Sequence, residues 1–555
     1  MLTRSRFFLI LFLFLFLIIF LRLFQLQILN HSSSKIFDYL AERKILPERG
    51  RIFDRLSNPL VLNNNSYLLY FEPKKIDDPD KMIKKISVIL SMDEASLSSK
   101  FNKEKDWVAV TMVTKEKKEE IEKLKISGLG FDYVLKREYP EASLAAHLLG
   151  FVGKNYQGED IGYFGIEGYY NKDLSGLPGF IQSEKDLLGR PILIGKQEMV
   201  EPENGRDLIL TIDKNIQGMI KEKLKKGIER YQAESGCVIA ADPFSMAILA
   251  LVCLPDYDPK NYFLFSEEYF RNPAISDLYE PGSVFKPLIM AAALNEKKIK
   301  PNDFYNETGP ITIGEYSIRT WDNKYEGKIS MTRILQKSSN VGMVYVGEKL
   351  GDEKLYDYLK KYGFGQLTGI DLQGEVSGYL KPKSQWYPID FATVTFGQGI
   401  AVTPIQMIRA FAALVNGGVI FRPYVVLKII SSDGKQKIIK PKKEGQVITN
   451  MTSQIIKKML MEVVESGEVK WARPKGYTLG GKTGTAQVPI KGHYDPQKTI
   501  ASFIGFGPVK EPKFLILVIL RQPKTSPWGS ETAAPLFFEI AKELLIYYNI
   551  PPDNL

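Results

Sequence analysis

Residues 280–287 read EPGSVFKP and place Ser283 three positions before Lys286. On a helix this spacing puts both side chains on one face, where a lysine amine can take the proton of a serine hydroxyl. Pro287 fits a helix only in its first turn, so Ser283 is predicted at a helix start. The apolar run 288–294 predicts that this helix is buried. A lysine with the ordinary pKa of about 10.4 is a poor base at neutral pH, so the chemistry requires burial or a second cation nearby.

Two further clusters follow along the chain. Residues 338–340 read Ser-Ser-Asn before the apolar segment 341–346, a pattern that indicates a hydroxyl and an amide presented beside a helix. Residues 480–486 read GGKTGTA and predict an edge strand whose glycines let a substrate backbone approach closely. Taken singly, the three clusters could be a helix cap, a turn and a surface hairpin. Their order resembles the S-x-x-K, S-x-N and K-T-G signature of penicillin-binding proteins and class A β-lactamases.

Most of the remaining chain resembles class B penicillin-binding proteins. Segments 47–55 (PERGRIFDR), 137–153 and 165–179 are similar to the three motifs of that family's non-catalytic pedestal. Segment 202–213, PENGRDLILTID, is similar to the start of its transpeptidase domain. The resemblance implies a pedestal that also docks partners and contains buried ion pairs. The candidates for these ion pairs are Arg49, Arg55, Arg137 and Glu167.

The resemblance implies catalytic roles for five residues, which are Ser283, Lys286, Ser338, Asn340 and Lys482. Ser283 would attack the penultimate D-alanine carbonyl of a peptidoglycan stem peptide, and Lys286 would accept its proton. Ser338 would relay a proton to the leaving D-alanine, while Asn340 would orient Lys286 and the substrate amide. An amine from a neighbouring stem peptide would then resolve the acyl-enzyme.

The third cluster is implied to bind the substrate. Lys482 would supply the second cation and, with Thr483 and Thr485, would hold the terminal carboxylate, with Gly484 between them. Backbone N–H groups of Ser283 and Thr485 would form the oxyanion hole. No metal or organic cofactor enters this chemistry.

The predicted fold class is α+β. Segments 236–241 and 247–254 form a hairpin pattern, and 501–507 and 514–520 are two further β-rich runs followed by an apolar helix at 533–548. Helical segments lie between these two groups of strands. Strands from both ends of one unit predict a mainly antiparallel sheet flanked by helices.

Turn signals at 186–205 predict a domain boundary. We therefore expect a cytoplasmic tail at 1–6, a transmembrane helix at 7–24, an irregular α+β pedestal at 35–205 and a transpeptidase domain at 206–555.

The N-terminal segment is long enough to cross a membrane. Residues 7–21 are all Phe, Leu or Ile, and a hydrocarbon core about 30 Å thick needs roughly 17 to 25 helical residues. No small-x-small cleavage site follows, which favours an anchor over a cleaved signal peptide. Arg4 and Arg6 favour a cytoplasmic start. The expected location is the cell (inner) membrane, crossed once, with an extracytoplasmic catalytic domain.

Composition excludes several classes of function. The formal charge of +10 is modest for 555 residues, and no Arg/Lys block with interleaved aromatics predicts nucleic-acid binding. Cys237 and Cys253 are the only cysteines, and His31, His147 and His493 the only histidines. This set offers neither a cysteine-rich metal site nor an HExxH pair, so no metal is expected.

The two cysteines are predicted to lie opposite one another. If residues 244–246 form a three-residue turn, Pro243 pairs with Ala247, and the same register puts Cys237 across from Cys253. Buried free cysteine commonly behaves as a small hydrophobe, so two free thiols are expected. A disulfide between Cys237 and Cys253 remains the alternative.

The resemblance is greater to division-type than to elongation-type class B enzymes. It rests on SSNVG at 338–342, GIDLQGE at 369–375 and FGQGIAVTPIQ at 396–406. It implies septal wall synthesis from stem peptides on lipid-linked precursors, with β-lactams as inhibitors. A SEDS-family glycosyltransferase, which would contact the helix at 7–23, and other divisome membrane proteins are the implied partners.

Other functions remain open. The alternatives are an elongation-type transpeptidase, a D,D-carboxypeptidase or β-lactamase with water as acceptor, and a catalytically silent wall-synthesis scaffold or β-lactam sensor. A histidine-based serine hydrolase is disfavoured because the chain has no G-x-S-x-G elbow. Glu375 is expected to be structural rather than to activate water.

Overall fold

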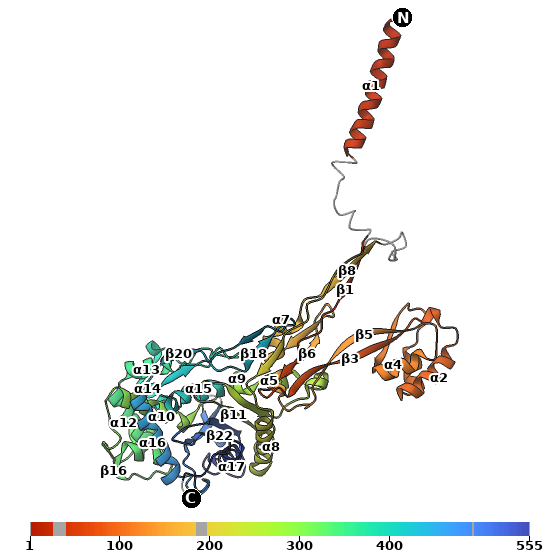
Figure 1. The fold of residues 1–555 in the computed structure, drawn as a ribbon. Coiled ribbons are helices and arrows are strands. Elements are labelled where there is room, and N and C mark those ends of the chain that lie inside the picture. Colours follow the sequence, from red (N-terminus) through yellow and green to blue (C-terminus); the bar gives the residue numbers. More distant parts are fainter. Residues whose placement is uncertain (1, 26–39, 185–196, 491–492, 554–555) are drawn as a thin grey trace. The chain divides into compact units, whose positions relative to one another are not determined.

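A long apolar helix, α1 (Leu2–Phe24), begins the structure (Figure 1). Its segment Arg6–Phe24 has a mean hydropathy of 3.1 over its most apolar stretch and is long enough to cross a membrane. This agrees with the predicted anchor. The computed structural model describes residues 2–25, 40–184, 197–490 and 493–553.

The chain divides into two compact units. The first comprises Met1–Glu48 and Ser175–Gly205, and the second Arg49–Leu174 and Arg206–Leu555. Besides α1, the first unit contains a three-stranded antiparallel sheet. The strands are, in order, β1 (Leu40–Ile45), β8 (Gly179–Glu184) and β9 (Gln197–Val200).

A seven-stranded sheet in the second unit joins segments from both predicted domains. The short strand β2 pairs antiparallel with β3 of the pedestal sequence and parallel with β10, which follows the predicted boundary. The strands are β19 (Gln436–Ile438), β18 (Val426–Ile430), β10 (Asp207–Leu210), β2 (Ile52–Phe53), β3 (Pro59–Phe71) and β4 (Val108–Val113), with β5 (Leu129–Glu138) also paired to β3.

Three capped helices pack with β3 and β4. Asp78, Asp93 and Thr114 each accept a hydrogen bond from a backbone N–H in the first turn of their helix. Leu69 and Phe71 of β3 belong to the core beneath these helices. The helices are α2 (Pro79–Leu90), α3 (Glu94–Lys100) and α4 (Lys115–Glu122).

The predicted antiparallel sheet is present, with five strands that come from both ends of the catalytic region (Figure 1). Side chains alternate between two cores, so that Leu517 packs on one face and Val518 on the other. In order, the strands are β12 (Ile248–Leu254), β11 (Ser235–Ala241), β23 (Phe514–Arg521), β22 (His493–Gly507) and β21 (Gly480–Ile490).

Helices cover both faces of this sheet, which confirms the predicted α+β class. One face packs against α8 (Lys214–Tyr231) and α17 (Ala533–Tyr547). The opposite face packs against α9 (Pro273–Ser276) and α15 (Pro404–Val415), and every residue of α15 is buried. The remaining helices of this block are α10 (Lys286–Asn295), α11 (Met331–Lys337), α12 (Asn340–Leu350), α13 (Asp352–Lys361), α14 (Pro388–Val394) and α16 (Asn450–Ser466).

Cys237 and Cys253 lie opposite one another in β11 and β12, as predicted. The register nevertheless shifts near the turn, because Asp242 accepts hydrogen bonds from Phe244 N (2.9 Å) and Ser245 Oγ (2.7 Å) and widens the loop. The predicted pairing at the turn itself is therefore wrong. The two sulfurs are joined in a disulfide, so the expectation of free thiols is also wrong.

A buried carboxylate organises the pedestal sequence. Glu167 of α6 (Gly165–Tyr169) is fully buried and accepts hydrogen bonds from Arg49 Nε and Arg137 Nε, each at 2.8 Å. Burial opposes the charged form of Glu167, but the two arginines outweigh it and hold the pKa of the carboxyl below its usual value. Arg55 is exposed, so its assignment to the buried ion pairs is wrong.

Candidate active site

Ser283 stands at a helix start, as predicted. It lies in the 3₁₀ turn η6 (Gly282–Phe285), which leads directly into α10. Gly282 has φ +57°, and a Cβ there would lie 3.2 Å from the carbonyl oxygen of Thr485. Glycine thus lets the turn approach β21 closely. Gly282, Val284 and Phe285 are buried, while Ser283 remains partly accessible. The packed residues around Ser283 therefore hold its backbone in place.

Lys286 is completely buried behind this turn. Its Nζ donates to the carbonyl oxygen of Ser338 (2.6 Å), to Oδ1 of Asn340 (2.8 Å) and to Oγ of Ser338 (3.2 Å). All three acceptors are neutral. Burial, followed by the charge of Lys482, lowers the pKa of Lys286 far below its usual value. The lowered pKa favours the neutral amine, which has two N–H groups to share among these acceptors and a lone pair that can accept a proton.

The break between α11 and α12 supplies these acceptors. Ser338 ends α11 in the left-handed conformation, with φ +59°. Ser339 caps α12 by accepting a hydrogen bond from Gly342 N at 2.9 Å. Asn340 Nδ2 donates to the carbonyl oxygen of Arg319 (3.0 Å), which fixes the amide so that its oxygen faces Lys286.

The third cluster forms β21, the predicted edge strand. Lys482 is buried, its Nζ donates to Thr483 Oγ1 (3.0 Å), and burial lowers its pKa to about 8. A Cβ at Gly484 would lie 2.4 Å from Ser502 Oγ and 2.9 Å from a Val284 methyl, so only glycine fits against η6. Thr485 Oγ1 accepts a hydrogen bond from Gly529 N (3.0 Å).

One cavity of about 380 Å³ joins the three clusters. Its lining includes five predicted residues, namely Ser283, Ser338, Asn340, Thr483 and Thr485. Sequence reasoning missed six others, which are Trp321, Glu468, Trp471, Trp528, Ser530 and Glu531. The rings of Trp321 and Trp528 are 5.3 Å apart. These residues belong to no short motif, and only the fold brings them together.

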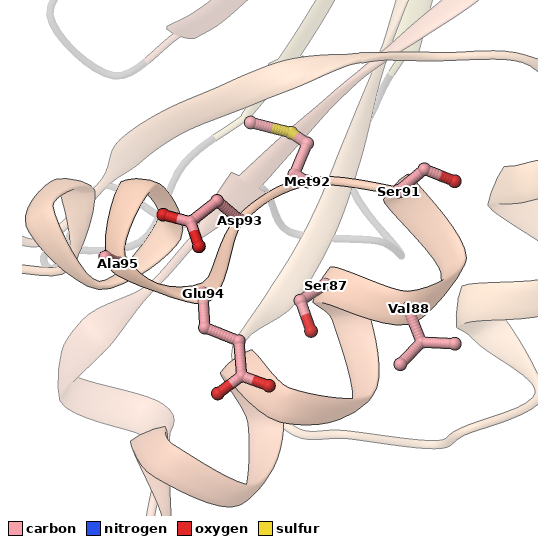
Figure 2. A pocket seen from close by; sticks show the side chains of 7 residues that line it. All are labelled: Ser87, Val88, Ser91, Met92, Asp93, Glu94 and Ala95. Atoms are coloured by element: carbon pink, nitrogen blue, oxygen red, sulfur yellow. The ribbon is translucent and has the colours of Figure 1, made fainter.

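A second, open hollow lies between α2 and α3 (Figure 2). It contains none of the predicted site residues and no nucleophile paired with a base. Its lining residues are Ser87, Val88, Ser91, Met92, Asp93, Glu94 and Ala95. Within the described ranges, no three His, Cys, Asp or Glu side chains gather as a metal site would require. The chemistry is therefore assigned to the cavity at Ser283.

Comparison with known proteins agrees with this geometry. Residues 236–542 match the family described as "Penicillin binding protein transpeptidase domain", and residues 44–210 match "Penicillin-binding Protein dimerisation domain". The chain belongs to the penicillin-binding proteins. The predicted family, fold and enzyme class, a class B penicillin-binding protein with a serine transpeptidase domain, are confirmed.

The similarity to individual proteins extends over more than nine tenths of this chain. The chain is 35% identical to stage V sporulation protein D of Bacillus subtilis over 91% of this chain and 79% of that protein. It is 30% identical to peptidoglycan D,D-transpeptidase FtsI of Escherichia coli K12 over 93% of this chain and 86% of that protein. The crystal structure of penicillin-binding protein 2X from Streptococcus thermophilus superposes with a TM-score of 0.79 at 25% identity, covering 91% of this chain and 80% of that one.

The two buried lysines predict a bell-shaped pH dependence for acylation of Ser283. The rate should rise as Lys286 loses its proton, well below the usual pKa of lysine, because only the neutral amine can act as a base. It should fall near pH 8, where Lys482 loses the charge that would hold a carboxylate. Initial rates of labelling by a fluorescent penicillin from about pH 5 to about pH 10 measure this profile.

Glu468 offers a matched test, because its charge raises the pKa of both lysines. Glu468→Gln should move both limbs of the profile to lower pH. Glu531→Gln is the control, since Glu531 lines the same cavity but is not among the causes of either shift. A wild-type rate that climbs steadily to about pH 10 would show instead that Lys286 keeps an ordinary pKa.

Proposed function

We propose that this penicillin-binding protein is a peptidoglycan D,D-transpeptidase of septal wall synthesis and that it works through an acyl-enzyme on Ser283. One observation carries the proposal. The partly accessible hydroxyl of Ser283 opens into the same cavity as Ser338 and Asn340, the residues that hold the buried Lys286 amine. A nucleophile, a base of lowered pKa and the groups that orient the base thus share one site.

In the acylation step, Lys286 Nζ takes the proton of Ser283 while Oγ attacks the carbonyl carbon of the penultimate D-alanine. When the tetrahedral intermediate collapses, the bond to the terminal D-alanine breaks and its nitrogen needs a proton. The contact of 3.2 Å between Lys286 Nζ and Ser338 Oγ supports Ser338 as the relay for that proton. The terminal D-alanine leaves, and Ser283 carries the acyl group.

Substrate binding is assigned to β21. Lys482, Thr483 and Thr485 would hold the terminal carboxylate of the stem peptide, and Gly484 would let the peptide backbone approach. Both threonines line the cavity, which supports this assignment. Backbone N–H groups of Ser283 and Thr485 would bind the developing oxyanion.

The acceptor that resolves the acyl-enzyme is proposed to be an amine of a second stem peptide. The name of the Escherichia coli relative, a D,D-transpeptidase, supports this acceptor. Glu375 is tied to the backbone N–H groups of Thr368 (2.7 Å) and Gly369 (3.0 Å), as expected of a structural residue. Glu468 and Glu531 in the cavity favour one second candidate, a D,D-carboxypeptidase, because a carboxylate there could activate water.

The membrane-anchored chain is proposed to have residues 1–6 in the cytoplasm and the rest beyond α1 outside, because wall precursors are crosslinked there. We assign 35–205 to the pedestal and 206–555 to the transpeptidase domain, and the family matches at 44–210 and 236–542 support this division. The relatives named FtsI support a role in septal wall synthesis. The apolar helix α1 supports the proposed attachment to the inner membrane.

The principal test is covalent labelling by a β-lactam. The full chain in detergent should form a lasting adduct on Ser283, located by mass spectrometry of a digest. Ser283→Ala should abolish labelling, and Lys286→Ala should slow it roughly a hundredfold or more because the base is lost. Lys482→Ala should mainly weaken capture of the ligand carboxylate. An adduct on another residue would reject the assignment, and rapid hydrolysis that Glu468→Gln or Glu531→Gln prevents would favour the carboxypeptidase.

The proposed partners, a SEDS-family glycosyltransferase and other divisome membrane proteins, would contact α1 and the pedestal. If α1 makes that contact, replacing residues 7–24 by an unrelated transmembrane helix should reduce recovery of the glycosyltransferase in pull-downs from detergent-solubilised membranes. The replaced chain must still be labelled by penicillin, which shows that it is folded. Undiminished recovery would count against contact through the helix.

A further inference from the structure

A single buried carboxylate holds both neighbours of Ser338. Glu307, at the end of β13 (Phe304–Glu307), is 1% exposed. Its Oε2 accepts a hydrogen bond from Lys337 Nζ at 3.0 Å, and its Oε1 accepts one from Ser339 Oγ at 2.5 Å. The two oxygens therefore fix the residue before Ser338 and the residue after it.

The turn at Ser338 needs such support. Its φ of +59° is a left-handed conformation, which costs free energy for a residue that carries a Cβ. Such a conformation persists only where the surrounding structure determines it. Glu307 meets this requirement from outside the turn, because β13 forms a separate two-stranded sheet with β16 (Gly327–Ser330).

The network around Glu307 is closed to solvent and well satisfied. The side chains of Lys337 and Glu307 are 6% and 0% exposed. Lys337 Nζ also donates to the carbonyl oxygen of Lys324, and Glu326 N donates to Glu307 Oε2 at 3.2 Å. A buried ion pair adds little net stability, but a fully bonded one defines a single geometry. The Glu307–Lys337 pair is therefore expected to fix the geometry of the turn at Ser338 more than to increase folding stability.

The turn at Ser338 contacts the amine of Lys286 directly. The carbonyl oxygen of Ser338, displayed by the turn, accepts the 2.6 Å hydrogen bond from Lys286 Nζ, and Ser338 Oγ lies 3.2 Å from the same atom. On the other side, the carbonyl oxygen of Lys337 accepts a hydrogen bond from Trp321 Nε1 (3.3 Å) in the cavity wall.

We propose that Glu307 and Lys337 are positioning residues of the catalytic centre. The carboxylate of Glu307, by holding Lys337 and Ser339, sets the left-handed turn that places Ser338 on Lys286. This inference rests on the proposed role of Lys286 as the base. A purely structural ion pair would affect folding stability alone, whereas a positioning pair also governs the rate and the pH dependence of acylation.

The test compares Glu307→Gln with Glu167→Gln in the full chain in detergent. Both changes neutralise a buried carboxylate that is bound by cationic side chains, but Glu167 contacts none of the proposed catalytic residues. Melting temperatures give the loss of stability, and the second-order rate of acylation by penicillin, per folded molecule, gives the effect on chemistry. Glu167→Gln should lower the melting temperature and leave the rate and the pH profile unchanged.

Glu307→Gln should lower the acylation rate at least tenfold and move the ascending limb of its pH profile to lower pH. The hydrogen bond from Lys286 to the Ser338 carbonyl favours the charged amine, and relaxing the turn removes that acceptor. The pKa of Lys286 should therefore fall, which moves the ascending limb to lower pH. Lys482 and Glu468, the other charged groups that act on Lys286, are unchanged in this variant. An unaltered rate and profile in folded Glu307→Gln would overturn the inference.

Two further variants keep the test decisive if Glu307→Gln does not fold. Ser339→Ala removes one arm, together with the cap on α12, and keeps the Glu307–Lys337 pair. It should show a smaller loss of rate than Glu307→Gln, with the same direction of shift. The exchange of both charges, Glu307→Lys with Lys337→Glu, restores an ion pair but offers Ser339 no acceptor, so it should not recover the wild-type rate. Full recovery by the exchange, or a wild-type rate in Ser339→Ala, would contradict positioning by the carboxylate. Failure of wild-type labelling at Ser283 would instead reject the proposed function.

Discussion

The burial of Lys286 and Lys482 near one another is the constraint on which the catalytic centre depends. Two ammonium groups out of contact with water and close enough to interact cannot both keep an ordinary pKa. Burial, followed by the charge of Lys482, lowers the pKa of Lys286 well below its usual value, whereas burial lowers the pKa of Lys482 to about 8. The pair therefore separates into a neutral amine for proton transfer and a cation for binding a carboxylate.

The fold supplies this arrangement from distant segments. The buried helix α10 carries Lys286, the break between α11 and α12 provides its acceptors, and the edge strand β21 brings Lys482. The edge position of β21 leaves one side of the strand unpaired, where an extended peptide can add to the sheet. Rigid packing thus surrounds the cavity into which the partly accessible Ser283 opens.

Much of this could be predicted from the sequence, since the ordered motifs and the period of the strands are local signals. The pairing of Cys237 with Cys253 could be predicted from the register of a hairpin. The bulge near the turn of that hairpin could not, because it depends on hydrogen bonds to the Asp242 side chain. Arg55 was misplaced because a motif does not specify burial. Glu307 and Glu468 escaped notice because their contacts with the site span long stretches of chain and leave no periodic pattern.

Transfer of an acyl group from Ser283 to an amine is measured most directly with a stem-peptide analogue that ends in D-Ala-D-Ala. Intact-protein mass spectrometry of the full chain should show a peptidyl adduct on Ser283 together with one released D-alanine. Addition of an amine acceptor should then clear the adduct and yield the joined peptide. D-alanine release without an adduct on Ser283, or an adduct that water clears equally fast with and without the amine, would contradict acyl transfer from Ser283 to an amine.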